Sequence, residues 1–158
     1  ELSYTFHGRD VYAYTGARLA SGVISYEEVG KELPLSEIVE LDVVETEYNK
    51  EEKSVTGCVD ILDVRFGSLW TSISRDDFYL LNPEFGKRYE VSIFHEHMLV
   101  YQNQVVYQHS FAEVAIGSPL LYINSVYRLG IAINQGSFAR AYNVGTGTNW
   151  KIRIRAID

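Results

Sequence analysis

Residues 150–157 read WKIRIRAI, in which apolar and basic side chains alternate as far as Ala156. In an extended chain successive side chains point to opposite faces, so Ile152, Ile154 and Ala156 would face a core while the basic side chains face water. This alternation predicts a half-buried β-strand near the carboxyl end of the chain.

Eight other segments after Pro34 are rich in β-branched and aromatic residues, which favour strands. Between two of them, Ser74 followed by Asp77 predicts one capped helical turn over residues 74–80. The predicted strands are residues 38–48, 54–64, 69–73, 88–94, 98–101, 104–111, 120–124 and 129–133. Turn residues separate them at 82–83, 103–104, 117–119 and 145–149. Many short strands with few helices predict an all-β fold, either an antiparallel sandwich or a barrel.

The first 34 residues have a helical rather than a strand-like character. Asp10 is placed to cap a helix of small residues over 11–21, which Gly22 would end. Ser25 and Glu28 have the spacing of a capping box, here for one short turn. We expect residues 1–158 to form one domain, with residues 1–34 lying against the strands or leading in from another domain.

Composition and charge exclude several classes of protein. The formal net charge of −7 argues against nucleic acid as a partner, because phosphate backbones demand a basic surface. No segment is long and apolar enough to span a bilayer and no secretory signal opens the chain, so we expect a cytoplasmic protein without a membrane partner. The lone Cys58 allows no internal disulfide, and its apolar neighbours predict a buried, inert thiol. Because the chain starts at Glu1 rather than at methionine, we expect it to be part of a longer protein.

No catalytic arrangement stands out along the chain. His95 and His97 share one face of an extended chain and could begin a metal site, but a polar hairpin edge is the better interpretation. Residues 145–147 imitate a phosphate loop without the lysine or the strand-to-helix context that this motif needs, so we interpret them as a turn. No serine lies in a nucleophile elbow. We therefore expect neither a catalytic residue nor a metal site in this chain.

Three segments place polar groups within aromatic or glycine-rich turns. They are Thr5-Phe6-His7-Gly8-Arg9-Asp10, Asp63-Val64-Arg65-Phe66-Gly67-Ser68-Leu69-Trp70, and Tyr122-Ile123-Asn124-Ser125 with residues 129–136. A helix start offers free N–H groups, aromatic faces stack on planar heterocycles, and carboxylates pair with ammonium groups. A purely structural explanation is equally good for the second segment and better for the first and third, as a helix cap and a strand turn.

Taken in this order, the three segments resemble the carboxy-terminal half of the S-adenosyl-L-methionine (SAM) hydroxide adenosyltransferases and the related fluorinases and chlorinases. The matching stretches are residues 5–10 with the helix through 19–22, residues 66–71, and residues 123–125 through 132–134. The resemblance spans most of the chain. It implies a mainly antiparallel, Greek-key-like β-barrel behind a short amino-terminal helical segment.

The resemblance also implies parts that this chain lacks. Family members carry an amino-terminal α/β domain and assemble as homotrimers, with SAM between the α/β domain of one subunit and the barrel of its neighbour. Water, hydroxide or halide displaces L-methionine from the 5′ carbon of SAM. SAM would thus be the substrate, and no cofactor is expected.

Roles at the adenine and at the ammonium group follow from the same resemblance. Asp63 would pair with the ammonium of the methionine portion, and Phe66 would stack on the adenine. Ser68 stands where halogenases carry an asparagine that reads the adenine edge. Because a hydroxyl cannot replace the paired donor and acceptor of an amide, this recognition would shift to backbone groups near Gln135.

Other matching residues would border the rest of the substrate. Phe6 and Gly8 would lie beside the ribose and the reaction centre. Trp70 and Phe111 would line the pocket, and Ser125 would hold the methionine carboxylate. These assignments place the two ends of SAM at different turns of the barrel.

Two departures from the family pattern bear on the mechanism. Val126 stands where fluorinases carry an arginine, which favours hydrolysis over halogenation slightly. His7, Arg9 and Asp10 have the residue types of the family's water-activating trio, but they lie in the linker motif. Helix capping and interdomain packing are their expected roles.

Together these assignments predict a domain that clamps SAM while the absent α/β domain holds the nucleophile. Water or hydroxide would give adenosine, and the chain alone would be inactive. A halide-using enzyme of the chlorinase type is one alternative. The other is a stand-alone barrel that binds a carbohydrate, nucleotide or protein without chemistry, because all-β folds host many functions.

Overall fold

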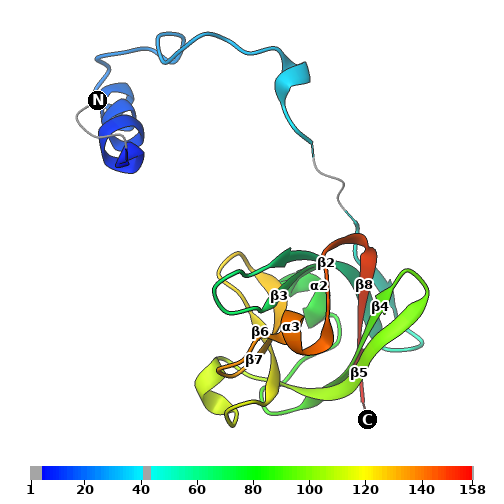
Figure 1. Cartoon of the computed structure of the whole chain (residues 1–158). Coiled ribbons are helices and arrows are strands. Elements are labelled where there is room, and N and C mark those ends of the chain that lie inside the picture. The colour runs from blue at the N-terminus through cyan, green and yellow to red at the C-terminus, as the bar shows by residue number, and fades with distance from the viewer. Residues whose placement is uncertain (1–4, 41–43, 158) are drawn as a thin grey trace. The chain divides into compact units, whose positions relative to one another are not determined.

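Two units make up the chain, Glu1–Leu41 and Asp42–Asp158, and each is described by itself (Figure 1). The computed structural model describes residues 5–40 and 44–157. In the first unit a π-helix, η1 (Gly8–Ala13), continues directly into α1 (Tyr14–Ala20), and a 3-10 turn, η2 (Leu35–Glu37), follows later. None of the described residues of this unit is buried.

The helix of the first unit begins earlier than the sequence predicted. Asp10 lies within its first turn, where a carboxylate oxygen pairs with Arg9 Nε at 2.5 Å, so the predicted cap at Asp10 is wrong. The predicted end is confirmed, because Gly22 has a φ of +69°, the left-handed conformation common after helix ends. The Ser25 amide donates to the Glu28 carboxylate at 2.8 Å, as in half of a capping box, and the predicted short turn follows.

The second unit is a closed barrel of strands. Hydrogen-bonded neighbours follow the order β2-β3-β7-β6-β5-β4-β8, and β8 pairs back onto β2 to close a ring of seven strands. β1 adds to β2 outside this ring. The strands are β1 (Glu47–Asn49), β2 (Ser54–Leu62), β3 (Leu69–Ser74), β4 (Arg88–His95), β5 (Met98–Tyr107), β6 (Pro119–Ile123), β7 (Arg128–Ile133) and β8 (Gly147–Ala156).

This architecture confirms the predicted all-β barrel with a short amino-terminal helical segment. The ladders are antiparallel except that β5 and β6 run parallel. Three predicted boundaries are wrong. β8 begins at Gly147, within the turn predicted over residues 145–149. The strand predicted over 38–48 forms a ladder only at β1, with residues 41–43 outside the described part. The turn predicted at 103–104 is absent, since β5 is continuous there, and Phe111 opens the 3-10 turn η3 (Phe111–Glu113).

The barrel interior holds the main core. In β8 the predicted alternation is confirmed: Ile152 and Ile154 are fully buried, whereas Lys151 is exposed. Two short helices, α2 (Arg75–Tyr79) and α3 (Phe138–Tyr142), each contribute a fully buried phenylalanine to the same core. The barrel is therefore filled by side chains rather than open as a channel.

A smaller cluster lies on the outer side of β6 and β7. Leu120, Tyr122 and Ala132 form it, and they alternate along the strands with residues that face the barrel interior. Phe111 and Val114 pack over this outer face from the segment around η3. This packing carries Phe111 to one end of the β6–β7 hairpin, where the candidate site lies.

Candidate functional site

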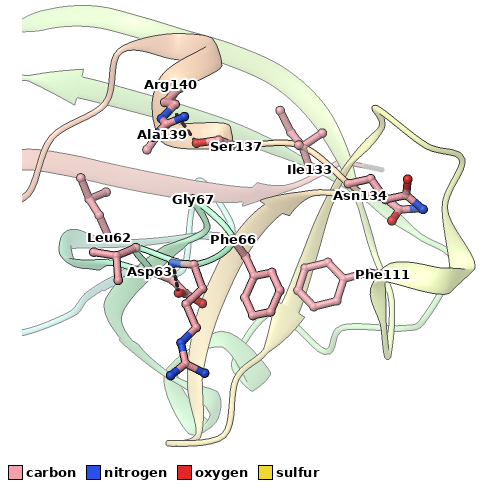
Figure 2. A pocket seen from close by; sticks show the side chains of 14 residues that line it. Leu62, Asp63, Phe66, Gly67, Phe111, Ile133, Asn134, Ser137, Ala139 and Arg140 are labelled. Carbon is pink, nitrogen blue, oxygen red and sulfur yellow. Dashed lines mark hydrogen bonds between the residues drawn. The ribbon is translucent and has the colours of Figure 1, made fainter.

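A groove of about 900 Å³ opens at the end of the barrel where β2 passes into β3 and where β7 ends. Its walls are the turn of residues 63–67, residues 133–137, the start of α3, and Phe111. Figure 2 shows these segments, which are far apart in the sequence, gathered around one hollow. Four of the nine residues that the sequence singled out line it: Asp63, Phe66, Phe111 and Gln135.

Two aromatic rings give the groove its apolar faces. Phe66 stands at the tip of its turn with 64% of its surface exposed. Phe111 is half-buried, and its ring packs at 5.1 Å between centroids against the ring of Tyr122. In Figure 2 the two phenylalanine rings lie beside each other at the groove. An exposed ring opposite a supported ring is suited to hold a flat, aromatic ligand.

The turn that carries Phe66 is fixed by its own hydrogen bonds. The Asp63 amide donates to the Ser68 carbonyl at 2.9 Å, and one carboxylate oxygen of Asp63 accepts from the Arg65 amide at 2.9 Å. Asp63 is half-buried and forms no ion pair with any residue in the described part of the chain. Its negative charge is therefore available to a cationic ligand group.

Gly67 joins this turn to α3 through a close approach that only glycine permits. Its φ is +67°, and a Cβ there would lie 2.0 Å from the Oγ of Ser137. The Gly67 carbonyl accepts from the Ala139 amide at 3.0 Å, while Ser137 Oγ caps the helix by accepting from the Arg140 amide at 3.2 Å. Two walls of the groove are thus held together at one glycine.

The opposite wall is held by Asn134. The backbone N–H of Asn134 donates to the Ser118 carbonyl at 3.0 Å, and its backbone carbonyl accepts from the Gly117 N–H at 2.8 Å. The side-chain nitrogen of Asn134 donates to the Val114 carbonyl at 2.8 Å. The next residue, Gln135, is exposed and adopts the left-handed conformation with a φ of +56°. Such a conformation in a non-glycine residue is uncommon outside tight turns and functional sites.

Ser68 and Trp70 lie behind the groove rather than in its wall. Ser68 is only 1% exposed, and its hydroxyl lies near enough to the hydroxyl of Tyr122 to influence its pKa. Trp70 Nε1 donates to the same hydroxyl at 3.2 Å. Burial raises the pKa of Tyr122, and these two neighbours partly oppose that effect. Ser68 and Trp70 do not line the groove. They act on it indirectly, because they lie beside Tyr122, whose ring packs against Phe111.

Sequence reasoning did not assign a role to Tyr122, although it is the hub of this cluster. Trp70, Gly130 and Tyr122 are directly opposite one another across β3, β7 and β6. A Cβ on Gly130 would lie 2.8 Å from the tyrosine ring, so the glycine leaves room for the ring to lie across β7. A glycine within an otherwise apolar strand is the sequence signal that could have indicated this close packing.

Ser125 lies at the other end of the β6–β7 hairpin from the groove. Its turn is held by Asn124, whose side-chain oxygen accepts from the amides of Val126 at 3.0 Å and Arg128 at 2.9 Å. Ser125 itself is exposed. The structure therefore brings Asp63 and Phe66 together but places Ser125 one strand length away from them.

Phe6 and Gly8 belong to the first unit, so their part in the site stays a prediction. The Arg9 guanidinium lies 4.9 Å from the centre of the Phe6 ring, and Arg9 also pairs with Asp10. These contacts are local to the helix start. They do not support the expected capping role, because no side-chain hydrogen bond caps η1 among the described residues, and the expected interdomain packing stays a prediction.

No group of three or more metal-ligating side chains occurs within residues 5–40 and 44–157. His95 instead stacks on Trp150 at 4.4 Å between ring centroids, and its Nε2 lies 3.1 Å from the side-chain nitrogen of Asn149. β4 ends at His95, and residues 96–97 form the turn into β5, which confirms the interpretation of His95 and His97 as a polar hairpin edge. Among the described helices, none has the length and apolar character needed to cross a membrane.

Comparison with known proteins gives a consistent set of relatives. The sequence profile of the SAM hydroxide adenosyltransferase C-terminal domain matches residues 57–151. A fluorinase from Actinopolyspora mzabensis is 30% identical over 149 residues, which cover 94% of this chain and 48% of that protein. A protein named (R)-S-adenosyl-L-methionine hydrolase from Thermus thermophilus is 32% identical over 143 residues, which cover 90% of this chain and 47% of that protein.

Solved structures agree with the sequence comparison. A crystal structure of an uncharacterized conserved protein from Thermotoga maritima superposes with a TM-score of 0.64 at 29% sequence identity. The match covers 99% of this chain and 54% of that protein. The chain thus spans about half the length of the relatives it matches.

Proposed function

This chain belongs to the family of SAM hydroxide adenosyltransferase C-terminal domains, and on that premise we propose that it clamps SAM in an enzyme that releases L-methionine. The proposed reaction is displacement at the 5′ carbon by water or hydroxide, which gives adenosine. Use of halide in place of water is the alternative within the family. Both reactions need the same grip on the two ends of the substrate.

One observation carries this proposal: the groove joins a half-buried carboxylate to two aromatic rings and an exposed amide. In the proposed complex the adenine lies against Phe66 and Phe111, an arrangement that stacking on aromatic faces favours. Asp63 pairs with the positively charged ammonium group of the methionine portion, an interaction that is strongest where water is excluded. The absence of a competing ion pair at Asp63 among the described residues supports this role.

Ser125 is left out of the proposed site. The ammonium and carboxylate groups of methionine are attached to the same carbon, whereas Asp63 lies at the groove and Ser125 at the other end of the β6–β7 hairpin. The six residues of β7 between these ends span roughly 17–20 Å at about 3.3 Å per residue. Asp63 and Ser125 of one chain therefore cannot both hold the methionine of one SAM molecule, and the proposal keeps the methionine at Asp63.

The chemistry needs alignment more than acid catalysis. The oxygen of the nucleophile forms a bond to the 5′ carbon while the bond from that carbon to sulfur breaks. The electron pair of the breaking bond goes to sulfur, which becomes the neutral thioether of methionine, so no proton has to be delivered to the leaving group. The barrier lies in orienting the two groups and in removing water from the nucleophile. Clamping of both substrate ends is the proposed contribution of this chain.

The nucleophile is held by an α/β domain in this proposal, and a homotrimer completes the site from a neighbouring subunit. The chain spans about half of its relatives, which leaves room for such a domain in the whole protein. The first unit also presents large apolar side chains, among them Phe6 at 58% exposed and Tyr12 at 71%. These side chains are suited to pack on the α/β domain, with Gly8 allowing close approach to the ribose.

Product analysis tests the proposal. The protein with its α/β domain is incubated with SAM, with and without chloride, and the products are separated and identified. L-Methionine and adenosine are expected under both conditions. Chlorinated adenosine would support the halide alternative, and the absence of both nucleoside products would overturn the proposal.

A matched pair of variants ties the reaction to the groove. Asp63→Asn should weaken SAM binding by about 2–5 kcal/mol, because a desolvated ammonium group would lose its charged partner. Asp76→Asn is the control, since the Asp76 carboxylate is 81% exposed and lies outside the groove. Equal affinities of the two variants for SAM would remove Asp63 from the site.

A further inference from the structure

Recognition of an adenine edge requires a hydrogen-bond acceptor beside a donor. The exocyclic amino group of adenine donates, and the neighbouring ring nitrogen accepts. A primary amide presents the complementary pair, whereas a hydroxyl, a carboxylate or a guanidinium presents only part of it. The groove therefore needs a free amide if it is to distinguish adenine from other purines.

Ser68, the first candidate from the sequence, does not meet this requirement. Its side chain is 1% exposed, does not line the groove, and lies near the hydroxyl of Tyr122. An adenine between Phe66 and Phe111 could reach Ser68 only after the buried cluster opened. The structure therefore assigns the adenine edge to another residue.

Asn134 is the second amide beside the groove, and it is already engaged. Its side-chain nitrogen donates to the Val114 carbonyl at 2.8 Å, and both of its backbone polar groups are bonded to the neighbouring loop. Rotation of this amide toward a ligand would break the bond to Val114. Asn134 is thus a support for the loop.

Gln135 is the remaining amide in the groove. Its side chain is exposed and makes no hydrogen bond to another described residue. The backbone is held in the left-handed conformation between the bonded Asn134 and Gly136, whose amide donates to the Ile133 carbonyl at 3.1 Å. A fixed backbone reduces the entropy that the side chain loses when it binds a ligand.

The other polar side chains of the groove do not provide the required pair. Arg65 and Arg140 carry only donors, and Asp63 carries only acceptors when ionised. The Ser137 hydroxyl is the cap of α3 and accepts from the Arg140 amide. Elimination among the side chains of the groove therefore leaves one residue, Gln135, near which backbone groups were the readers expected from the sequence.

We propose that the side-chain amide of Gln135 reads the adenine edge and makes the groove specific for 6-aminopurines over 6-oxopurines. This inference rests on the proposed function, because it assumes that adenine occupies the groove. The side-chain oxygen of Gln135 accepts from the amino group of adenine, and its nitrogen donates to the adjacent ring nitrogen. Inosine, with an oxygen at position 6, places an acceptor where adenine has a donor and breaks this match.

The test compares the affinities of adenosine and inosine for the protein with its α/β domain, by calorimetric titration. The unaltered protein should bind adenosine more tightly by about tenfold or more, as expected for one bidentate contact to a base. In Gln135→Ala this preference should fall to near unity through weaker binding of adenosine, with inosine little changed. Gln135→Gly also removes the amide but favours the left-handed backbone, so it should give the same result if the side chain is responsible.

Two further variants separate the possible failures. Gln102→Ala removes an exposed glutamine on β5, outside the groove, and should keep the full preference for adenosine. Phe66→Ala should weaken both nucleosides alike, because stacking does not depend on the group at position 6. An unchanged preference in Gln135→Ala, with both nucleosides weakened in Phe66→Ala, would overturn the role of Gln135 alone. Unchanged binding in Phe66→Ala, or no binding by the unaltered protein, would overturn the proposed function as well.

Discussion

The indole nitrogen of Trp70 donates to the hydroxyl of Tyr122 at 3.2 Å, across a strand that places Gly130 between them. The same hydroxyl lies near the hydroxyl of the buried Ser68, and the tyrosine ring supports Phe111 at the groove. One side chain on β6 therefore links three residues that were expected to contact SAM directly. Tyr122 positions the aromatic wall without lining the groove itself.

Removal of this hydroxyl should destabilise the barrel. Tyr122→Phe leaves the indole nitrogen of the half-buried Trp70 without its partner and removes the polar neighbour of the buried Ser68 hydroxyl, at a cost of about 1–3 kcal/mol in the free energy of unfolding. Urea denaturation of the chain measures this loss. Tyr127→Phe is the matched control, because Tyr127 is 68% exposed, and it should change the free energy of unfolding by less than about 0.5 kcal/mol. Equal values for the two variants would show that the cluster around Tyr122 adds no stability.

The contact between Gly67 and Ser137 gives a second prediction. Gly67→Ala introduces a Cβ 2.0 Å from Ser137 Oγ and forces α3 away from the turn that carries Phe66. We expect a loss of about 1–3 kcal/mol from overpacking, in addition to the strain of a positive φ, together with weaker binding of adenosine. Gly86→Ala isolates the strain, because Gly86 has a φ of +84° with open space around it. The expectation fails if both alanine variants unfold at the same urea concentration.

Local sequence patterns were sufficient to predict most strands of the barrel, but they did not predict all strand boundaries. The alternation in β8 identifies its buried face, because one side of this strand meets the core, but the strand begins at Gly147, within the turn predicted over residues 145–149. In β5, Asn103 and Gln104 were interpreted as a turn, yet both are exposed residues within a continuous ladder with β4. Pairing with a long neighbour overrides the weak strand propensity of such polar residues.

The segment before β1 shows the opposite error. Residues 38–48 have strand-like composition, but a strand also needs a free edge to pair with. β2 offers such an edge only along residues Ser54, Val55 and Thr56, which bind β1, while β3 occupies its later part. The composition of residues 38–48 gives no information about how much of the β2 edge is free for pairing.

The candidate site was predictable only in part for a similar reason. Asp63 and Phe66 share one turn, so a motif within a few residues can identify them. Tyr122 contacts Trp70 across 52 positions of sequence, and Ser137 contacts Gly67 across a similar distance along the chain. Such contacts are set by strand register. The burial of Ser68 likewise depends on Tyr122, which no local pattern connects to it.

The start of α2 offers a test of a prediction that was confirmed. Ser74 and Asp77 form a complete capping box, in which Ser74 Oγ accepts from the Asp77 amide at 3.0 Å and the Ser74 amide donates to the Asp77 carboxylate at 3.1 Å. Ser74→Ala should lower the free energy of unfolding by about 1 kcal/mol in a thermal or urea melt. Ser110 precedes η3 without forming a side-chain cap, so Ser110→Ala serves as the control and should have little effect. A larger loss in the control would contradict the capping role.

Cys58 is expected to be inert at neutral pH. Burial raises the pKa of its thiol to about 11, and the thiol also lies 3.0 Å from a carboxylate oxygen of Asp60, which disfavours the thiolate further. At pH 8 the thiolate fraction should be about 100-fold lower than for a thiol of ordinary pKa. The native chain should therefore react with a disulfide reagent at least about 100-fold more slowly than the chain unfolded in guanidinium chloride.

The same shift fixes the sign of a pH effect on stability. Because the folded chain holds the thiol proton more tightly than the unfolded chain, the contribution of Cys58 is complete below the ordinary thiol pKa of about 9 and is lost as the pH rises toward about 11. The difference in unfolding free energy between the unaltered chain and Cys58→Ala should shrink across this interval and stay constant between pH 6 and about pH 8. Both proteins contain the same tyrosine and lysine side chains, so the contribution of these groups to the pH dependence cancels in the difference. A difference that is constant up to pH 11, together with fast labelling of the native chain at pH 8, would place the thiol in contact with solvent and contradict its burial.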